Sequence, residues 1–389
     1  MKKLLSLLIP ALLLIPLCSF SQASPPRNSL EHKVDSLIQY GIQNKAFPGA
    51  QVLIFKNDSI QLNKSYGYQT YDSLNPITNS NLYDLASVTK VLASTLAFMK
   101  LYELYDIDLN KKVSSYIPLL KRSNKKNTSF KEVLSHSGGW IPYIAHQNLI
   151  YKKNGDYKNR TVSSKQNNKY PTQISDSLFI HKKYAKKILS RIKKTKIGDS
   201  GTYLYSGLWF FLLPELTLEL SGLSFTGFLN THFYSPLKLK RLTFLPSNQF
   251  PKDEIVPTEI DSLFRKKLVQ GWVHDEAAAM MGGISGNAGL FANASSIAPL
   301  LKMFLQKGSI DGIQLLKPKT LELFTQRTFP QSENRRGLGF DKPSIKIDDP
   351  YPSELVSPES YGHSGFTGTF IWVDPIDKSF VVFLSNRVY

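Results

Sequence analysis

The segment Asp84-Leu85-Ala86-Ser87-Val88-Thr89-Lys90 places a serine and a lysine three residues apart. On a helix, side chains at positions i and i+3 lie on one face, so the Lys90 amine would lie beside the Ser87 hydroxyl. An amine in that position can take the hydroxyl proton as the serine attacks a carbonyl carbon. The spacing therefore predicts a nucleophile with its own base. An isolated Ser-x-x-Lys in a lysine-rich chain is usually a chance match, so the surrounding residues carry the argument.

The residues around Ser87 have the pattern of an amphipathic helix. Five apolar residues fall within one stripe about 100° wide at 3.6 residues per turn: Val88, Val91, Leu92, Met99 and Tyr102. The pattern predicts a helix from Ser87 to about Tyr102 with one buried face. Asp84 is the candidate N-cap, which would place Ser87 in the first turn, where the helix dipole favours a developing alkoxide.

Two later segments complete a series of motifs. Tyr205-Ser206-Gly207 comes at the start of an apolar predicted helix, and His363-Ser364-Gly365 lies on a predicted strand near the C-terminus. The series resembles the serine β-lactamase and penicillin-binding-protein superfamily, in its class C and DD-peptidase branch. Further blocks resemble the family in their usual order, namely residues 82–86, 134–139, 234–237 and 288–291. The resemblance covers roughly residues 30 to 387.

This resemblance implies a role for each motif residue. Ser87 would form an acyl-enzyme that water or another acceptor cleaves, with Lys90 as the base. Desolvation beside the apolar stripe favours the neutral amine that this role requires. Tyr205 would hydrogen-bond Ser87 and relay the proton to the leaving group. The backbone N–H groups of Ser87 and of Phe366, next to Gly365, would form the oxyanion hole.

Two motif positions depart from the β-lactamase pattern. His363 stands where β-lactamases of this branch usually have lysine, and in this it resembles the DD-peptidases and D-aminopeptidases. Gly207 replaces the asparagine that usually ends the tyrosine motif, which removes an amide that would hold the acyl side chain of the substrate. We therefore expect a DD-carboxypeptidase or D-amino-acid peptidase acting on cell-wall peptides. A carboxylesterase or β-lactamase of the same fold, or a penicillin-recognising sensor without turnover, are the alternatives.

Other polar groups in the sequence favour structural roles. Glu259, Asp261, Arg265 and the adjacent pair His274-Asp275 form a cluster whose spacing does not fit a helical metal pair, so we expect an ion-pair network. His136, which precedes a serine and two glycines, is interpreted as structural. The sequence has no Gly-rich phosphate loop and no zinc signature. We expect no cofactor, no bound metal and no nucleic-acid partner.

Both ends of the chain contain hairpin patterns. β-like runs at residues 49–55 and 60–66 follow an amphipathic helix at 29–45, and a second pair lies at 369–373 and 380–385. We expect a single domain over residues 24–389 with an α/β (α+β) fold. Its antiparallel sheet would come from about 28–80 and 285–389, flanked by helices, and a mostly helical region from about 105–284 would be inserted. The last strand would end four residues before Tyr389, without the helix that follows it in the family.

The N-terminus and the charge distribution concern the location of the protein. Lys2 and Lys3, an apolar run over 4–17 and Ser21-Gln22-Ala23 predict a signal peptide over residues 1–23 and export to the periplasm or envelope. An uncleaved anchor and a lipoprotein at Cys18, the only cysteine, are the alternatives. After cleavage we expect no spanning helix.

Residues 151–196 hold 14 Lys/Arg against two acids, within a chain of net charge +18. This basic insert is either a solvated surface or a contact for an anionic envelope polymer.

Overall fold

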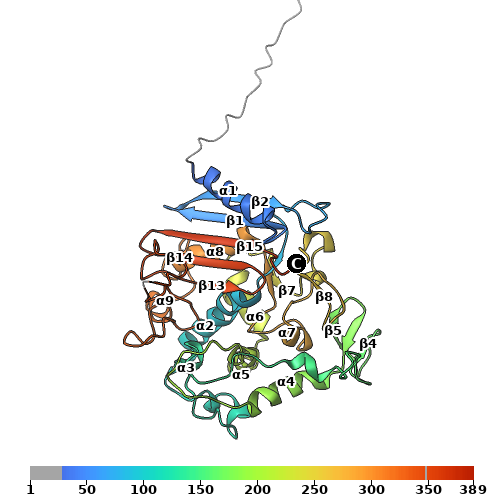
Figure 1. Cartoon of the computed structure of the whole chain (residues 1–389). Helices are drawn as coiled ribbons and strands as arrows, with labels where there is room; N and C mark the ends of the chain where they lie inside the picture. Colours follow the sequence, from blue (N-terminus) through green and yellow to red (C-terminus); the bar gives the residue numbers. More distant parts are fainter. Residues whose placement is uncertain (1–28, 347) are drawn as a thin grey trace, which may run out of the picture.

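A computed structural model describes residues 29–346 and 348–389, so the predicted signal peptide lies outside the described residues. Its main sheet has five strands in the order β13-β14-β15-β1-β2, each antiparallel to its neighbours. The strands are β1 (Gly49–Lys56), β2 (Ser59–Gly67), β13 (Tyr361–Gly365), β14 (Thr369–Asp374) and β15 (Ser379–Ser385). Figure 1 shows the blue N-terminal hairpin beside the red C-terminal strands. The prediction of one antiparallel sheet made by both chain ends is confirmed.

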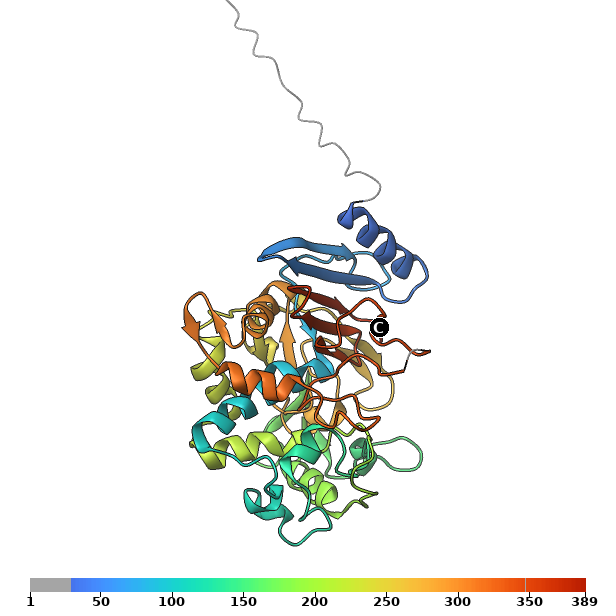
Figure 2. The same ribbon diagram turned by 90° about the vertical axis from the view of Figure 1, so that its left-hand side faces the viewer.

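Helices cover both sides of this sheet. Helix α1 (Leu30–Gln43) packs on β2, where Ile38 meets Val52, Leu62 and Tyr66 in a small apolar cluster. On the other face, α8 (Ala294–Leu305) contacts β1, β14 and β15. Figure 2 shows α1 and the N-terminal hairpin at one end of the molecule, with the green and yellow helical region at the other. The α+β class follows from these layers.

The segment that contains Ser87 is helical but not a regular α-helix. A 3₁₀ turn at Ala86–Val88 leads into a π-helix at Lys90–Thr95 and then α2 (Leu96–Tyr105). The predicted apolar stripe is buried in the main core. Short π-helical segments are often found at functional sites, and this one begins at Lys90.

The inserted region between the two parts of the sheet contains mostly short elements. Helix α3 (Phe130–Leu134) begins with a capping box, because Ser129 Oγ accepts from the Glu132 N–H at 3.2 Å and Glu132 Oε2 accepts from the Ser129 N–H at 2.7 Å. The other helices of this region are α4 (Lys183–Lys194), α5 (Leu213–Ser221), α6 (Phe225–Leu229) and α7 (Glu276–Met280). Small sheets join β3 (Tyr83–Asp84), β10 (Leu290–Ala292) and β7 (Leu242–Phe244), and β4 (Val162–Ser163), β6 (Leu178–Ile180) and β5 (Thr172–Ser175).

The remaining strands and α-helix lie outside the main sheet. They are β8 (Glu259–Asp261), β9 (Lys267–Val269), β11 (Ser309–Ile310), β12 (Ile313–Gln314) and α9 (Pro318–Thr325). Within the described ranges, no helix has both the length and the apolar character needed to cross a membrane.

The basic insert folds as β4–β6 followed by α4. Helix α4 buries Tyr184, Ile188 and Ile192 against the core and carries basic residues along its other face. The lysines at 182, 186, 187, 194 and 196 are exposed. The insert is therefore anchored by an apolar stripe and presents cations to solvent.

Candidate active site

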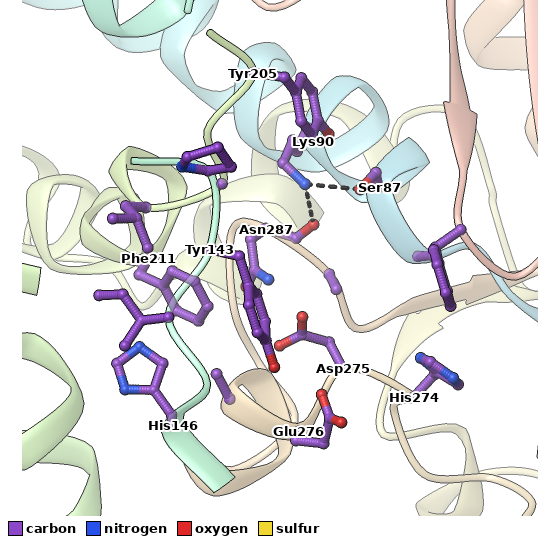
Figure 3. A pocket seen from close by; sticks show the side chains of 18 residues that line it. Ser87, Lys90, Tyr143, His146, Tyr205, Phe211, His274, Asp275, Glu276 and Asn287 are labelled. Atoms are coloured by element: carbon purple, nitrogen blue, oxygen red, sulfur yellow. Dashed lines mark hydrogen bonds between the residues drawn. The ribbon is translucent and has the colours of Figure 1, made fainter. Parts of the chain in front are cut away.

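Ser87 and Lys90 lie in direct contact, as their spacing predicts. Lys90 Nζ is 2.9 Å from Ser87 Oγ and donates a second hydrogen bond to the backbone oxygen of Asn287 at 2.8 Å. Figure 3 shows these two hydrogen bonds, which hold the Lys90 amine between Ser87 Oγ and the backbone oxygen of Asn287. The Lys90 side chain is buried. The carbonyl of Asn287 orients the base, and no sequence pattern points to it.

The backbone bends sharply just before the nucleophile. Ala86 has φ +45°, in the left-handed region that a non-glycine residue rarely adopts. The buried Asp84 carboxylate holds this bend, because it accepts from the Ala86 N–H at 2.8 Å and from the His274 N–H at 2.6 Å. The prediction that Asp84 is the N-cap of a helix starting at Ser87 is wrong. Asp84 instead ties the turn to the His274 segment.

The end of the sheet packs on the same turn. Thr367 Oγ1 donates to the backbone oxygen of Asp84 at 2.7 Å, and Thr369 Oγ1 donates to the backbone oxygen of Leu85 at 2.9 Å. A Cβ atom at Gly365 would lie 2.5 Å from the Leu85 oxygen, so only glycine permits this approach. Phe366, which follows Gly365, lines the same pocket as Ser87, and the role of their N–H groups as an oxyanion hole stays a prediction. The two threonines were not among the sequence predictions.

Tyr205 lies over Lys90 but does not make the predicted contact with the nucleophile. Its ring centroid is 5.6 Å from Lys90 Nζ, and among the described residues no hydrogen bond joins Tyr205 to Ser87. The ring packs 4.5 Å from the His136 ring and 5.9 Å from the His363 ring. His136 Nδ1 also accepts from the Ser206 N–H at 3.2 Å, so His136 positions the whole tyrosine motif.

His363 lies on β13 behind Tyr205 and is buried. Its Nδ1 is 2.7 Å from the Ser364 oxygen, and because a carbonyl can only accept, the proton is on Nδ1. The Nε2 lone pair has no partner among the described residues. Burial, with the Arg336 and Lys90 charges, lowers the pKa of His363 to about 3. His363 is therefore a neutral acceptor at the place where a lysine would be a cationic donor.

An ion-pair cluster lies behind these rings. Asp341 binds Arg335 Nε at 2.7 Å and Arg336 Nη1 at 3.3 Å. Burial alone would raise the pKa of Asp341, but Arg336 and Arg335 outweigh it and lower the pKa to about 2. Arg336 also contacts His136 at 3.3 Å. No sequence pattern around Arg335, Arg336 or Asp341 predicted that these residues lie next to the site.

A pocket of about 430 Å³ opens in front of Ser87 and Lys90. Gly207 and Phe366 line it near the serine, whereas His363 and Gly365 lie outside its wall. A Cβ atom at Gly207 would lie 3.9 Å from Lys90 Cε, so the missing asparagine leaves space there. The far wall carries Tyr143, His146, Asp275 and Glu276, as Figure 3 shows.

Glu259, Asp261, Arg265 and His274 form the expected ion pairs of the polar cluster, whereas Asp275 caps α7 instead. His274 Nε2 is 3.2 Å from Glu259 Oε2, and Arg265 Nη1 is 3.2 Å from Asp261 Oδ2. Through the bond from His274 to Asp84, this network also supports the turn before Ser87. In the described part of the chain, no group of three His, Cys, Asp or Glu side chains could hold a metal ion.

Comparisons with known proteins agree with this fold. The Beta-lactamase family model matches residues 34–389. A protein of Salmonella agona (strain SL483) named "Putative D-alanyl-D-alanine carboxypeptidase" is 31% identical over 377 residues, which cover 92% of this chain and 82% of that protein.

Two solved structures are similar in fold. The octameric penicillin-binding protein homologue from Pyrococcus abyssi has a TM-score of 0.67 at 19% identity and covers 92% of this chain and 74% of its own. A class C β-lactamase has a TM-score of 0.65 at 18% identity and covers 94% of each chain. The match over nearly the whole described chain shows that this protein belongs to the Beta-lactamase family, as a serine hydrolase.

Proposed function

We propose that the protein is an exported DD-carboxypeptidase that cleaves cell-wall peptides ending in D-amino acids through an acyl-enzyme at Ser87. The contact of 2.9 Å between Ser87 Oγ and Lys90 Nζ is the observation that carries this proposal. The neutral His363 in place of a lysine, and the curated relative named for this activity, support a peptidase over a β-lactamase.

The reaction would proceed in two halves. As Ser87 Oγ attacks the carbonyl, its proton passes to the Lys90 amine acting as general base, and the N–H groups of Ser87 and Phe366 stabilise the oxyanion. The tetrahedral intermediate collapses when the leaving amine receives a proton, and Tyr205 is the candidate to deliver it. Among the described residues Tyr205 makes no hydrogen bond to Ser87, so this role requires its hydroxyl to contact the leaving group in the substrate complex. Water then attacks the acyl-enzyme and restores the Ser87 hydroxyl.

Assays with three substrates distinguish the candidate activities. The purified protein from residue 24 onward would be incubated separately with a D-Ala-D-Ala peptide, a fluorescent penicillin and a short-chain nitrophenyl ester. Release of D-alanine supports the peptidase, and rapid penicillin hydrolysis would support a β-lactamase instead. Ester turnover alone would support an esterase, and a stable adduct without turnover a sensor. Lys90→Ala should slow acylation by roughly 10²- to 10⁴-fold, the usual contribution of general-base catalysis.

Export is part of this proposal because cell-wall peptides lie outside the cytoplasm. Lys2, Lys3, the apolar run over 4–17 and Ala23 support cleavage before Ser24. Mass spectrometry of the protein from its native envelope should find Ser24 as its first residue. An intact Met1 in a soluble cytoplasmic fraction would contradict export.

The basic insert supports a second, independent proposal of attachment to an anionic envelope polymer. Its charge of +12 is concentrated within 46 residues, and α4 directs part of it to solvent. Screening weakens exposed charge contacts as the Debye length falls from ~10 Å at 0.1 M to ~3 Å at 1 M salt. Sedimentation with wall material should show binding at low salt and loss at high salt. Equal binding at both, or none at either, would leave the insert as a solvated surface.

A further inference from the structure

The far wall of the pocket carries several hydrogen-bond acceptors that have no salt-bridge partner among the described residues. Asp275 and Glu276 both face the pocket, and neither takes part in a salt bridge among the described residues. Asp275 Oδ1 accepts from the Ala278 N–H at 2.7 Å, whereas the Glu276 carboxylate has no side-chain partner there. Unpaired carboxylates are notable in a chain with 48 Lys/Arg against 30 acids.

A buried histidine adds an independent observation at the same wall. His146 is 1% exposed, lines the pocket, and has no hydrogen-bond partner at either ring nitrogen among the described residues. A buried polar group without a partner costs free energy, which a bound ligand can recover. Burial lowers the pKa of His146 to about 4, so the ring is neutral and has one lone pair to offer. The Tyr143 hydroxyl donates to Gln147 Oε1 at 2.9 Å and keeps its own lone pairs free.

The neighbouring cations are already engaged elsewhere. Arg265 is bound to Asp261 and to the oxygens of Val273 and His274. Arg191 donates to the Ala145 oxygen at 3.2 Å. Lys90 is fixed at the other end of the pocket by Ser87 and Asn287. His274, which also lines the pocket, is paired with Glu259 at 3.2 Å, so each of these cationic side chains already has a partner other than Asp275 and Glu276.

The direction of the pocket decides which part of a substrate reaches this wall. Figure 3 shows Tyr205 at one end, Asp275 and Glu276 at the other, and Ser87 with Lys90 between them. In the proposed reaction the leaving group faces Tyr205, so the part that stays on Ser87 extends toward Asp275 and Glu276.

We infer that this pocket selects acyl groups whose side chain ends in a primary ammonium, held by Glu276 and Asp275 with Tyr143 and His146 as further acceptors. The inference rests on the proposed acyl-enzyme and specifies its substrate class. An ammonium has three donors and one positive charge, which matches carboxylates and neutral acceptors. Hydrogen bonds between charged groups are about twice as strong as neutral ones.

The test uses two nitrophenyl esters that differ only in that charge, those of 6-aminohexanoic acid and of 6-acetamidohexanoic acid. We expect kcat/KM of the wild-type protein to be at least about 10-fold higher for the amino ester, as expected for one charged hydrogen bond. Glu276→Gln should bring the ratio of the two values close to one, and Asp275→Asn should lower it while keeping the helix cap. Glu219→Gln, which makes the same change on an exposed face of α5, should leave the ratio unchanged.

The outcomes separate the two proposals. Acylation of Ser87 by both esters without preference, or a preference that survives in Glu276→Gln, would overturn the ammonium site alone. Absence of acylation by either ester would overturn the acyl-enzyme and the ammonium site together. The unfolding midpoint of each variant, measured by circular dichroism, should match the wild type, and a folded Glu276→Gln protein is required for its ratio to count.

Discussion

At the scale of single residues, burial determines what each group in the site can do. Lys90 is buried with two oxygen acceptors, which keeps its amine directed at Ser87. His363 is buried beside Arg336 and is held neutral, so β13 contributes an acceptor rather than a charge. The neutral state of His363 therefore depends on its burial and on the neighbouring charges as well as on the residue type.

The first prediction concerns that position. His363→Lys would bury a further cation beside Arg336 and Lys90 without adding a carboxylate to pair with it. We expect the free energy of unfolding to fall by about 3 kcal/mol, as for other uncompensated buried charges. Denaturant unfolding measures this, with His363→Gln as the neutral control. A His363→Lys protein as stable as the wild type would show that the buried position at residue 363 accepts a cation.

At the scale of elements, the turn before Ser87 depends on contacts from β14 and from the loop that precedes it. Thr367 and Thr369 donate to the oxygens of Asp84 and Leu85, and Gly365 allows the close approach. These bonds join strands near residue 370 to a turn near residue 85. They therefore fix the position of the turn, and of Ser87 after it, relative to the sheet.

We therefore predict that Thr369→Val slows acylation. The change keeps the side-chain shape but leaves the Leu85 oxygen without this donor, which costs about 1–3 kcal/mol for a buried group. Thr217→Val on α5 removes a similar buried bond, to the Leu213 oxygen at 2.9 Å, far along the chain from the turn. Stopped-flow acylation should be at least about 10-fold slower for Thr369→Val only. Equal rates in the two variants would show that the bond serves stability alone.

The elements also show which parts of the site the sequence could predict. The contact between Ser87 and Lys90 and the two hairpins depend on neighbours within a few residues, so the sequence pattern alone was sufficient to predict them. The Asn287 oxygen, the two threonines and the Arg336–Asp341 pair reach the site from more than 100 residues away. Pairings over such distances depend on the complete fold. The N-cap prediction was wrong because Asp84 bonds across the chain to His274 as well as locally to Ala86.

At the scale of the whole molecule, buried neutral histidines link folding to pH. Burial is the largest cause that lowers the pKa of His136, His146 and His363. The folded state keeps these rings neutral, whereas the unfolded chain binds protons near pH 6.5. Their contribution to stability is therefore present above pH 6.5 and is lost as the pH falls. His274 acts in the opposite direction, because Glu259 outweighs burial and raises its pKa.

We predict that the free energy of unfolding decreases from pH 7 to pH 5, by up to ~2 kcal/mol for each of the three histidines. Protonation of His274 stabilises the folded state over the same range and offsets part of this decrease. Below pH 4, protonation of Asp341 should decrease the free energy of unfolding further, because the pKa of this carboxyl is lowered to about 2 in the folded state. Denaturant unfolding at several pH values provides the measurement. A stability that is constant or higher at pH 5 would contradict the buried neutral state.

The most direct test of the central claim is the mass of the protein after reaction with a slowly deacylating penicillin. We expect one adduct, mapped by peptide sequencing to the peptide that contains Ser87. Ser87→Ala should remove the adduct, and Ser295→Ala, a change at an exposed serine, should retain it. An adduct at another residue, or hydrolysis of ester and peptide by Ser87→Ala at the wild-type rate, would contradict Ser87 as the nucleophile.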